Sequence, residues 1–221
     1  DILCGKANPS GKLPMTFPVS YLDIPSSANF PYNYKKTQTG DWDFLWGGKK
    51  KEQKCVDYTE YNEGIYVGYR YFQTAGAPVS YPFGYGKSYT TFEYSKPVVK
   101  ATADGFTATI TVKNTGSVAG KESVQLYVAA PAGGLEKPAF ELKGFAKTKE
   151  LAPGESQTLT IDVCRYTLAS FNEANSAWET AAGTYKVMFG ANAADIRGTA
   201  EYKLKKAESW KVNNVLAPAQ P

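Results

Sequence analysis

Hydrophobic and polar residues alternate along several short segments between residues 91 and 206. From Phe106 to Val112 every second residue is hydrophobic, and threonines lie between. A period of two is typical of a strand with one buried face. The triplet Asn114-Thr115-Gly116 then ends this strand with residues that favour turns.

The same alternation recurs further along the chain. It is present in 122–131, twice within 139–163 on either side of a turn at 152–155, and twice more within 183–206. About six or seven short strands at regular spacing are typical of an antiparallel β-sandwich. The sequence therefore predicts a mainly β fold for residues 91–206.

The first 90 residues differ in pattern. They are rich in proline, glycine, asparagine and tyrosine and contain few periodic segments. The segment 57–72 predicts a helical turn followed by a strand, and about residues 30–54 predict a long polar and aromatic loop. So few elements do not form a core alone, and the opening sequence "DILCGKANPSGKLP" is typical of the middle of a domain. We therefore expect the native chain to continue upstream of Asp1.

Composition excludes several classes of function. The net charge is +4, but the lysines are dispersed, which does not favour nucleic-acid binding. No run of ~18 apolar residues predicts a membrane span, and no signal peptide is visible. The chain has no histidine, so it cannot build a Ser-His-Asp triad, a Cys-His dyad or an imidazole-ligated zinc site by itself. We expect no metal and no cofactor.

The three cysteines, Cys4, Cys55 and Cys164, lie far apart in the sequence. A Cys4–Cys55 disulfide is compatible with an oxidising compartment, but spacing alone does not decide it. Free structural thiols are the favoured interpretation.

One loop contains the candidate substrate-binding residues. Asp41 and Asp43 flank Trp42, and Trp46 follows. Indole faces stack on sugar rings, so Trp42 and Trp46 are candidates for carbohydrate contact. The competing interpretation, which we favour, is a surface loop whose aromatic residues pack on a neighbouring domain.

A second group of acids lies in the segment "DYTEYNEG" and comprises Asp57, Glu60 and Glu63. Glu63 is the weak candidate for an acid/base, since that role requires burial to raise its pKa. A local structural role is favoured, such as an ion pair with Arg70. No catalytic residue is assigned to this chain.

The segment 81–95, "YPFGYGKSYTTFEYS", is rich in aromatic residues. Gly84 and Gly86 permit tight turns, and Phe83, Tyr85 and Tyr89 are expected to fill the space around them. The segment lacks a nucleophile with its base, which catalysis needs. We interpret it as a rigid block that docks the sandwich onto the preceding region; a sugar-binding platform is the alternative.

Several motifs together cover nearly the whole chain: "NPSGKLPMTFP" (8–18), "YNEGIYVGYRYF" (61–72), the segment 81–95, "VKNTGSVAGKESVQLYV" (112–128), "ELKGFAKTKELAPGES" (141–156) and "GTYKVMFG" (183–190). In sequence and in order they resemble glycoside hydrolase family 3, of the β-glucosidase type. The resemblance implies that residues 1–90 are the carboxy-terminal portion of the family's α/β-sandwich domain. It implies that 91–206 form a fibronectin type III-like, immunoglobulin-like sandwich, followed by a tail at 207–221.

The resemblance also implies an activity and partners. By this resemblance, the family's enzymes use an Asp nucleophile on an amino-terminal barrel and usually a Glu acid/base on the α/β domain. A retaining glycosidase needs both carboxylates. No position in this chain matches either motif, so the chain alone is expected to be inactive. The expected whole protein is an exo-acting β-glucosidase, with β-xylosidase as the alternative, and its 30–54 loop is expected near the active-site mouth. Its expected partners are the upstream domains and a β-glucoside or oligosaccharide, with no nucleic acid and no membrane.

The remaining expectations concern location and alternatives. The resemblance implies a periplasmic or extracellular enzyme, and the lack of a permitted N-glycosylation sequon weakly favours a bacterial source. A non-catalytic carbohydrate-binding or adhesion module is the main alternative, and it predicts an exposed aromatic row on one sheet, which no single strand contains. Trp178 is expected to cap the core or to face the docking surface, and Trp210 to anchor the tail. An independent enzyme using only its own acids is the least favoured hypothesis.

Overall fold

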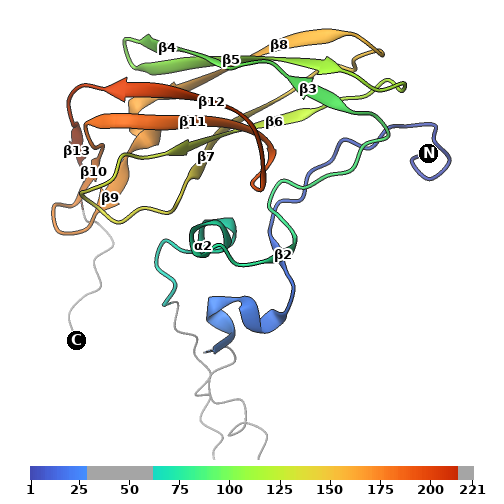
Figure 1. The fold of residues 1–221 in the computed structure, drawn as a ribbon. Helices are drawn as coiled ribbons and strands as arrows, with labels where there is room; N and C mark the ends of the chain where they lie inside the picture. Colours follow the sequence, from blue (N-terminus) through green and yellow to red (C-terminus); the bar gives the residue numbers. More distant parts are fainter. Residues whose placement is uncertain (29–61, 214–221) are drawn as a thin grey trace, which may run out of the picture.

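The computed structural model describes residues 1–28 and 62–213, and it places a β-sandwich above a smaller region that packs against its underside (Figure 1). Within these residues, none of the helices has the length and hydrophobicity required to span a bilayer. The smaller region contains β1 (Phe17–Pro18), 3₁₀ helices η1 (Tyr21–Asp23) and η2 (Pro25–Ala28), α2 (Tyr69–Ala75) and β2 (Val79–Tyr81).

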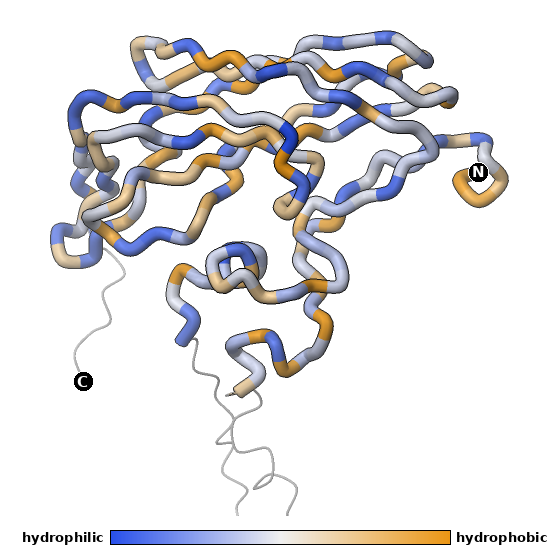
Figure 2. The backbone as a smooth tube through the Cα atoms, viewed as in Figure 1, coloured by the Kyte–Doolittle hydropathy of each residue, from blue (hydrophilic) through white to orange (hydrophobic). Residues whose placement is uncertain are grey.

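Two antiparallel sheets form the sandwich. One contains β5, with β8 on one side and β3 and β4 on the other; the second has the order β12-β11-β6-β7. The bounds are β3 (Phe92–Tyr94), β4 (Val98–Thr102), β5 (Gly105–Asn114), β6 (Ser123–Ala129), β7 (Glu141–Lys147), β8 (Ser156–Cys164), β11 (Gly183–Asn192) and β12 (Asp195–Leu204). The predicted mainly β, antiparallel sandwich is confirmed, and its strands alternate in hydropathy (Figure 2).

A third, small sheet lies at one end of the sandwich. It has the order β13-β10-β9, and a 3₁₀ helix, η4 (Arg165–Leu168), precedes it. Its strands are β9 (Ser170–Asn172), β10 (Ala177–Glu179) and β13 (Ser209–Lys211). Part of the expected tail therefore pairs with β10. The proposed domain limits themselves stay a prediction.

The core lies between the two large sheets. The alternating residues of β5, from Phe106 to Val112, are at most 1% exposed, as the pattern predicted. β6 differs, because Gln125 and Tyr127 on its other face are also buried. That second face of β6 is covered by the smaller region, so this strand is buried on both sides.

The strand expected at the end of 57–72 is wrong, because residues 69–75 form the helix α2. Gly76 ends this helix with a φ of 63°, a left-handed conformation that glycine adopts without strain. Tyrosine and phenylalanine favour strands on average, but packing decides the outcome. Here Phe72 is buried and Tyr69 packs on the sandwich.

Both edge strands of the second sheet contain an irregularity. In β7, Lys143 has no partner, since Gly144 pairs with Leu126 and Leu142 with Tyr127. In β12, Arg197 is likewise the extra residue between two paired neighbours. Each is a β-bulge, which places one unpaired residue at the edge.

Candidate functional site

The junction between the smaller region and the sandwich contains several buried or partly buried hydrogen bonds made by side chains. Gln125 of β6 is 5% exposed and lies at its centre. Its amide nitrogen donates to the carbonyl of Gly84 (3.2 Å) and to that of Ala191 (3.1 Å), and the Tyr127 hydroxyl donates to its amide oxygen. One side chain thus connects the segment 81–95 to two strands of the sandwich.

Gly84 is required at this point. Its φ is +79°, and a Cβ atom there would lie 2.1 Å from the Gln125 amide oxygen. The backbone N–H of Gly84 donates to the carbonyl of Leu13 (2.8 Å), which draws the amino-terminal segment into the same junction. Glycine is therefore needed in "FGYG" for two reasons: the backbone has a positive φ at Gly84, and it passes close to the buried side-chain amide of Gln125.

An aromatic cluster surrounds the polar centre. The ring of Tyr69, on α2, stacks on Phe83 at 4.7 Å between centroids, and it meets Tyr127 edge-on at 6.0 Å. Phe140 completes the cluster, 5.1 Å from Tyr127. The Tyr69 hydroxyl also accepts a hydrogen bond from the N–H of Leu142 (2.8 Å). Stacked and edge-to-face rings contribute beyond the area they bury, so the cluster fixes α2 against the second sheet.

The amino-terminal segment is held by Asn8. Its side chain donates to the Ser88 hydroxyl (3.0 Å) and accepts from the N–H of Tyr89 (2.8 Å). Its amide lies so close to Gly120 that a Cβ atom there would be at 2.1 Å. Tyr89, expected to fill space around the two glycines, is 50% exposed, and its hydroxyl donates to the carbonyl of Ile2.

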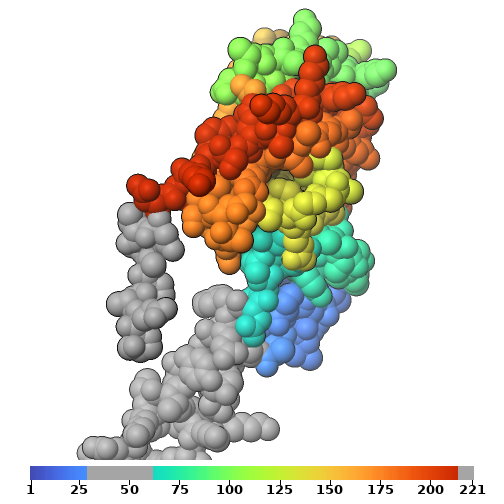
Figure 3. Space-filling view, turned by 90° about the vertical axis from the view of Figure 1, so that its left-hand side faces the viewer, coloured from blue at the N-terminus to red at the C-terminus, as the bar shows by residue number. Residues whose placement is uncertain are grey.

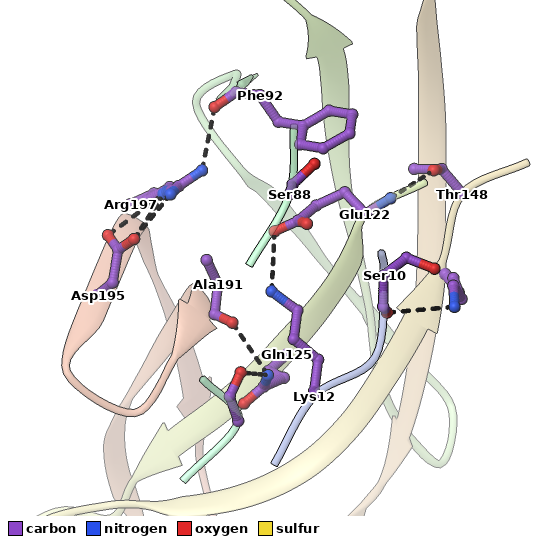
Figure 4. Close-up of polar contacts among 12 residues, drawn as sticks. Ser10, Lys12, Ser88, Phe92, Glu122, Gln125, Thr148, Ala191, Asp195 and Arg197 are labelled. Carbon is purple, nitrogen blue, oxygen red and sulfur yellow. Dashed lines mark hydrogen bonds and ion pairs between the residues drawn. The ribbon is translucent and has the colours of Figure 1, made fainter. Parts of the chain in front are cut away.

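A buried carboxylate, Glu122, forms a second polar centre (Figure 4). It accepts hydrogen bonds from the Tyr94 hydroxyl (2.8 Å) and from the Lys12 ammonium (3.4 Å). The Arg197 guanidinium lies 4.9 Å from the centre of the Tyr94 ring. Burial, with the adjacent Glu122 charge, raises the pKa of Tyr94 well above its ordinary value of 10.0.

This shift predicts alkaline sensitivity. A phenol whose pKa is higher in the folded chain stabilises the fold below pH ~10 and loses that contribution as the pH rises further, by up to about 1.4 kcal/mol per pH unit. We expect the free energy of unfolding of Tyr94→Phe to fall less steeply between pH 10 and 11.5 than that of the wild type. Urea denaturation at several pH values measures it. Tyr89→Phe, at a half-exposed tyrosine, is the control, and equal slopes for wild type and Tyr94→Phe would contradict the assignment.

On the outer side of the smaller region, an apolar hollow is open to solvent. It has a volume of about 570 Å³ and is lined by Leu13, Phe17, Tyr81 and Tyr85 with adjacent residues. Phe17 and Tyr81 are 43% and 46% exposed. Its lining includes Lys12 and Lys87 but no carboxylate or thiol, and its apolar part is suited to packing against another apolar surface.

The structure places few of the sequence-predicted site residues. Trp42 and Trp46, with the neighbouring acids at 41, 43, 57 and 60, lie outside the described residues. Glu63 is described and lines a groove against the sandwich. Its expected ion pair with Arg70 is wrong, since Arg70 binds Glu141 at 2.9 Å. Cys4 and Cys164 are free thiols, and Cys55 is outside the described part.

The junction therefore has the chemistry of a rigid joint. Within residues 1–28 and 62–213 no three Cys, Asp or Glu side chains are grouped as metal ligands. The contacts of 81–95 support a structural role for that segment, which stays a prediction. Gln125 and Glu122 were missed by sequence reasoning, because Gln125 occupies a polar position of the alternating pattern and Glu122 lies just before β6.

Comparison with known families divides the chain in two. The model of the Glycosyl hydrolase family 3 C-terminal domain matches residues 1–69, and that of the Fibronectin type III-like domain matches residues 122–193. The described residues of the first match belong to the smaller region and the segment leading into it, and the second match begins just before β6 and ends just after β11.

Relatives of known name match over nearly the whole chain. The probable beta-glucosidase K of Emericella nidulans is 39% identical over 212 residues, which is 95% of this chain and 22% of the relative. Beta-glucosidase A of Butyrivibrio fibrisolvens is 40% identical over 218 residues, 89% of this chain and 24% of the relative. The chain thus spans about a quarter of the length of these relatives.

Solved structures agree with the sequence relatives. Beta-glucosidase 3B from Thermotoga neapolitana, in complex with glucose, has a TM-score of 0.83 and 39% identity over 96% of this chain and 27% of that chain. Beta-glucosidase from Kluyveromyces marxianus, also in complex with glucose, has a TM-score of 0.80 and 38% identity, over 96% of this chain and 23% of that chain. The chain belongs to glycosyl hydrolase family 3 and corresponds to the carboxy-terminal part of its β-glucosidases.

Proposed function

We propose that this chain is the structural carboxy-terminal part of a retaining, exo-acting β-glucosidase. The whole protein removes terminal non-reducing β-linked glucose from oligosaccharides or β-glucosides. Its catalytic carboxylates lie upstream, and the sandwich supports the catalytic domains as a rigid buttress. Family resemblance favours a periplasmic or extracellular location.

The observation that carries this proposal is the exposed apolar surface of the smaller region. Leu3 is 98% exposed, Leu22 is 78% and Val19 is 64%, and the apolar hollow lies on the same region. Large apolar side chains exposed within one short segment, such as Phe17, Val19 and Leu22, are typical of a surface that faces another part of a protein. The upstream barrel and the remainder of the α/β domain are the proposed partners for it.

The joint gives the sandwich a mechanical role in that assembly. Gln125, the Tyr69 cluster and the ion pair of Glu122 with Lys12 all connect the smaller region to the sandwich, and the smaller region in turn has exposed apolar side chains. A side chain that is held by several buried hydrogen bonds restricts relative motion. The sandwich thereby holds the last elements of the α/β domain in place beneath it.

Hydrolysis assays test the proposal. We expect no turnover of 4-nitrophenyl β-glucoside or β-xyloside by the 221-residue chain, with its intact mass confirmed in the same sample, because a retaining glycosidase needs both carboxylates. The full-length protein is expected to hydrolyse the glucoside faster than the xyloside. A preference for the xyloside would favour the β-xylosidase alternative.

The opposite result is equally informative. Turnover by the 221-residue chain that is lost in Glu63→Gln would place the catalytic pair in this chain and refute the proposal. An Arg70→Gln variant, which breaks the ion pair with Glu141, is the matched control for a merely structural change nearby.

A further inference from the structure

Three aromatic side chains form a row across the small sheet. Trp178 in β10 lies directly opposite Phe171 in β9 and Trp210 in β13, and both pairings are antiparallel. Residues directly opposite one another in antiparallel strands lie on the same face of the sheet. We call Phe171, Trp178 and Trp210 the aromatic row. Tyr166 of η4 lies beside it, with its ring 5.8 Å from Trp178 and 5.4 Å from Trp210.

The aromatic row is on the outer face of the small sheet. Successive residues of a strand point to opposite faces, and Ala177, next to Trp178, is fully buried. By contrast Phe171 is 43% exposed and Tyr166 is 47% exposed. Phe171 therefore presents an apolar surface to solvent, and Trp178 and Trp210, which are partly buried, continue the row beside Tyr166.

A groove adjoins one end of the row. Its volume is about 600 Å³, and it is lined by residues 62–66 of the smaller region and by 135–136 and 171–174 of the sandwich. We call it the β9 groove. Phe171 belongs to both the groove and the row, so the two surfaces are continuous. Figure 3 shows the cyan segment after residue 61 lying against the yellow and orange surface of the sandwich.

The walls of the β9 groove are held in place by hydrogen bonds. The Tyr66 hydroxyl donates to the Glu136 carboxylate across the groove, at 2.8 Å. Beneath β9, the side-chain amides of Asn172 and Asn175 both donate to Glu179, each at 2.9 Å. These bonds, and a bond from the Lys137 ammonium to the Ser170 hydroxyl, fix the loop and hairpin that form the sandwich wall. A ligand would thus meet a largely pre-formed site, which lowers the entropic cost of binding.

The lining of the groove indicates the chemistry of its ligand. Three carboxylates, two amides and the Phe171 ring contribute to it, and no lysine or arginine is among the lining residues. Carboxylates only accept hydrogen bonds, so they suit a ligand rich in hydroxyl donors and repel anions. An aromatic face with negative charge density attracts the polarised C–H groups of a sugar ring. The volume is also in the range of small-molecule sites.

We propose that the β9 groove and the aromatic row form a binding surface for a neutral β-linked oligosaccharide. The reducing or non-reducing end of the chain sits in the groove, and following sugar units stack along Phe171, Trp178 and Trp210. The proposal takes its ligand class from the proposed function, but it assigns no catalytic step to this surface.

Calorimetric titration of the 221-residue chain with cellopentaose and laminaripentaose tests the proposal. We expect binding of at least one of them, and about tenfold weaker binding by Phe171→Ala, since one stacked ring is lost. Phe145→Ala is the matched control, because Phe145 is 73% exposed on β7, outside the groove. Glu173→Gln, an exposed substitution, provides a second variant that retains the fold and weakens binding by removing a charged acceptor.

Four results overturn the proposal: no heat from either sugar, equal affinities of Phe171→Ala and wild type, binding of decalysine in place of the sugars, and self-association that Phe171→Ala abolishes. The third would indicate a basic peptide as the ligand, and the fourth an interface between copies. Hydrolysis by the full-length protein is measured separately. Activity of that protein without sugar binding by the 221-residue chain refutes this inference alone, and absence of hydrolysis refutes the proposed function.

Discussion

Gly84→Ala is expected to lower the free energy of unfolding by about 3 kcal/mol. The new methyl group would lie 2.1 Å from the Gln125 amide oxygen, and the backbone φ of +79° is strained for alanine. Gln125 does not move aside without cost, because it bonds to the carbonyls of Gly84 and Ala191 and to Tyr127. The substitution therefore strains the backbone and also breaks the polar centre of the junction. Urea denaturation of the 221-residue chain measures the loss.

Gly154→Ala separates the two causes. Gly154 has nearly the same φ, +82°, but nothing lies within 4 Å of a Cβ atom built there. This control is expected to lose only the strain, about 1 kcal/mol. If the two alanine variants lost the same free energy of unfolding, the close contact between Gly84 and Gln125 would make no contribution to stability.

Asn114→Ala is expected to cost about 3 kcal/mol as well, for a different reason. The Asn114 side chain is fully buried, and its amide donates to the carbonyls of Val118 and Leu151, each at 2.8 Å. Its oxygen accepts from the Thr90 hydroxyl at 2.6 Å. Alanine would leave the buried Thr90 hydroxyl without this acceptor and would remove the bonds to the two carbonyls and from the N–H of Gly116 (3.1 Å). A buried polar group left without a partner costs about 1–3 kcal/mol.

Asn175→Ala is the matched control, because that amide is exposed and donates to Glu179 at the surface. We expect it to change the unfolding free energy by less than about 0.5 kcal/mol. Thermal or urea unfolding of both variants compares them. A loss for Asn114→Ala no larger than for Asn175→Ala would mean that water replaces the buried partners.

The sandwich could be predicted because the hydrophobic and polar residues alternate within each of its long strands. In β5 the alternation from Phe106 to Val112 depends on a single buried face, and the structure confirms it. In β6 the same alternation predicted the strand, but it did not predict that Gln125 and Tyr127 are buried. Their burial depends on a region about forty residues away along the chain, at Gly84, which no local period encodes.

The other errors have similar causes. Residues 69–75 contain three aromatic residues with high strand preference, yet contacts of Tyr69 with Phe83 and Tyr127 stabilise a helix. The strands β9, β10 and β13 have only three residues each, too few for a period to be read. The aromatic row was missed for the same reason, since it runs across strands and not along one. Trp42 and Trp46 stay candidates from the sequence.

The two bulges in the edge strands affect how the protein behaves at high concentration. A regular edge strand exposes unpaired N–H and C=O groups that can add a strand from another molecule and begin aggregation. Here the extra residue at each edge of the second sheet is a cation, Lys143 on β7 and Arg197 on β12. An incoming strand would meet a break in the ladder at both edges, and each cation is held there by an ion pair, Lys143 with Glu141 and Arg197 with Asp195. The second sheet is thus protected from edge-to-edge polymerisation, which matters for a protein that presents other apolar surface while it assembles.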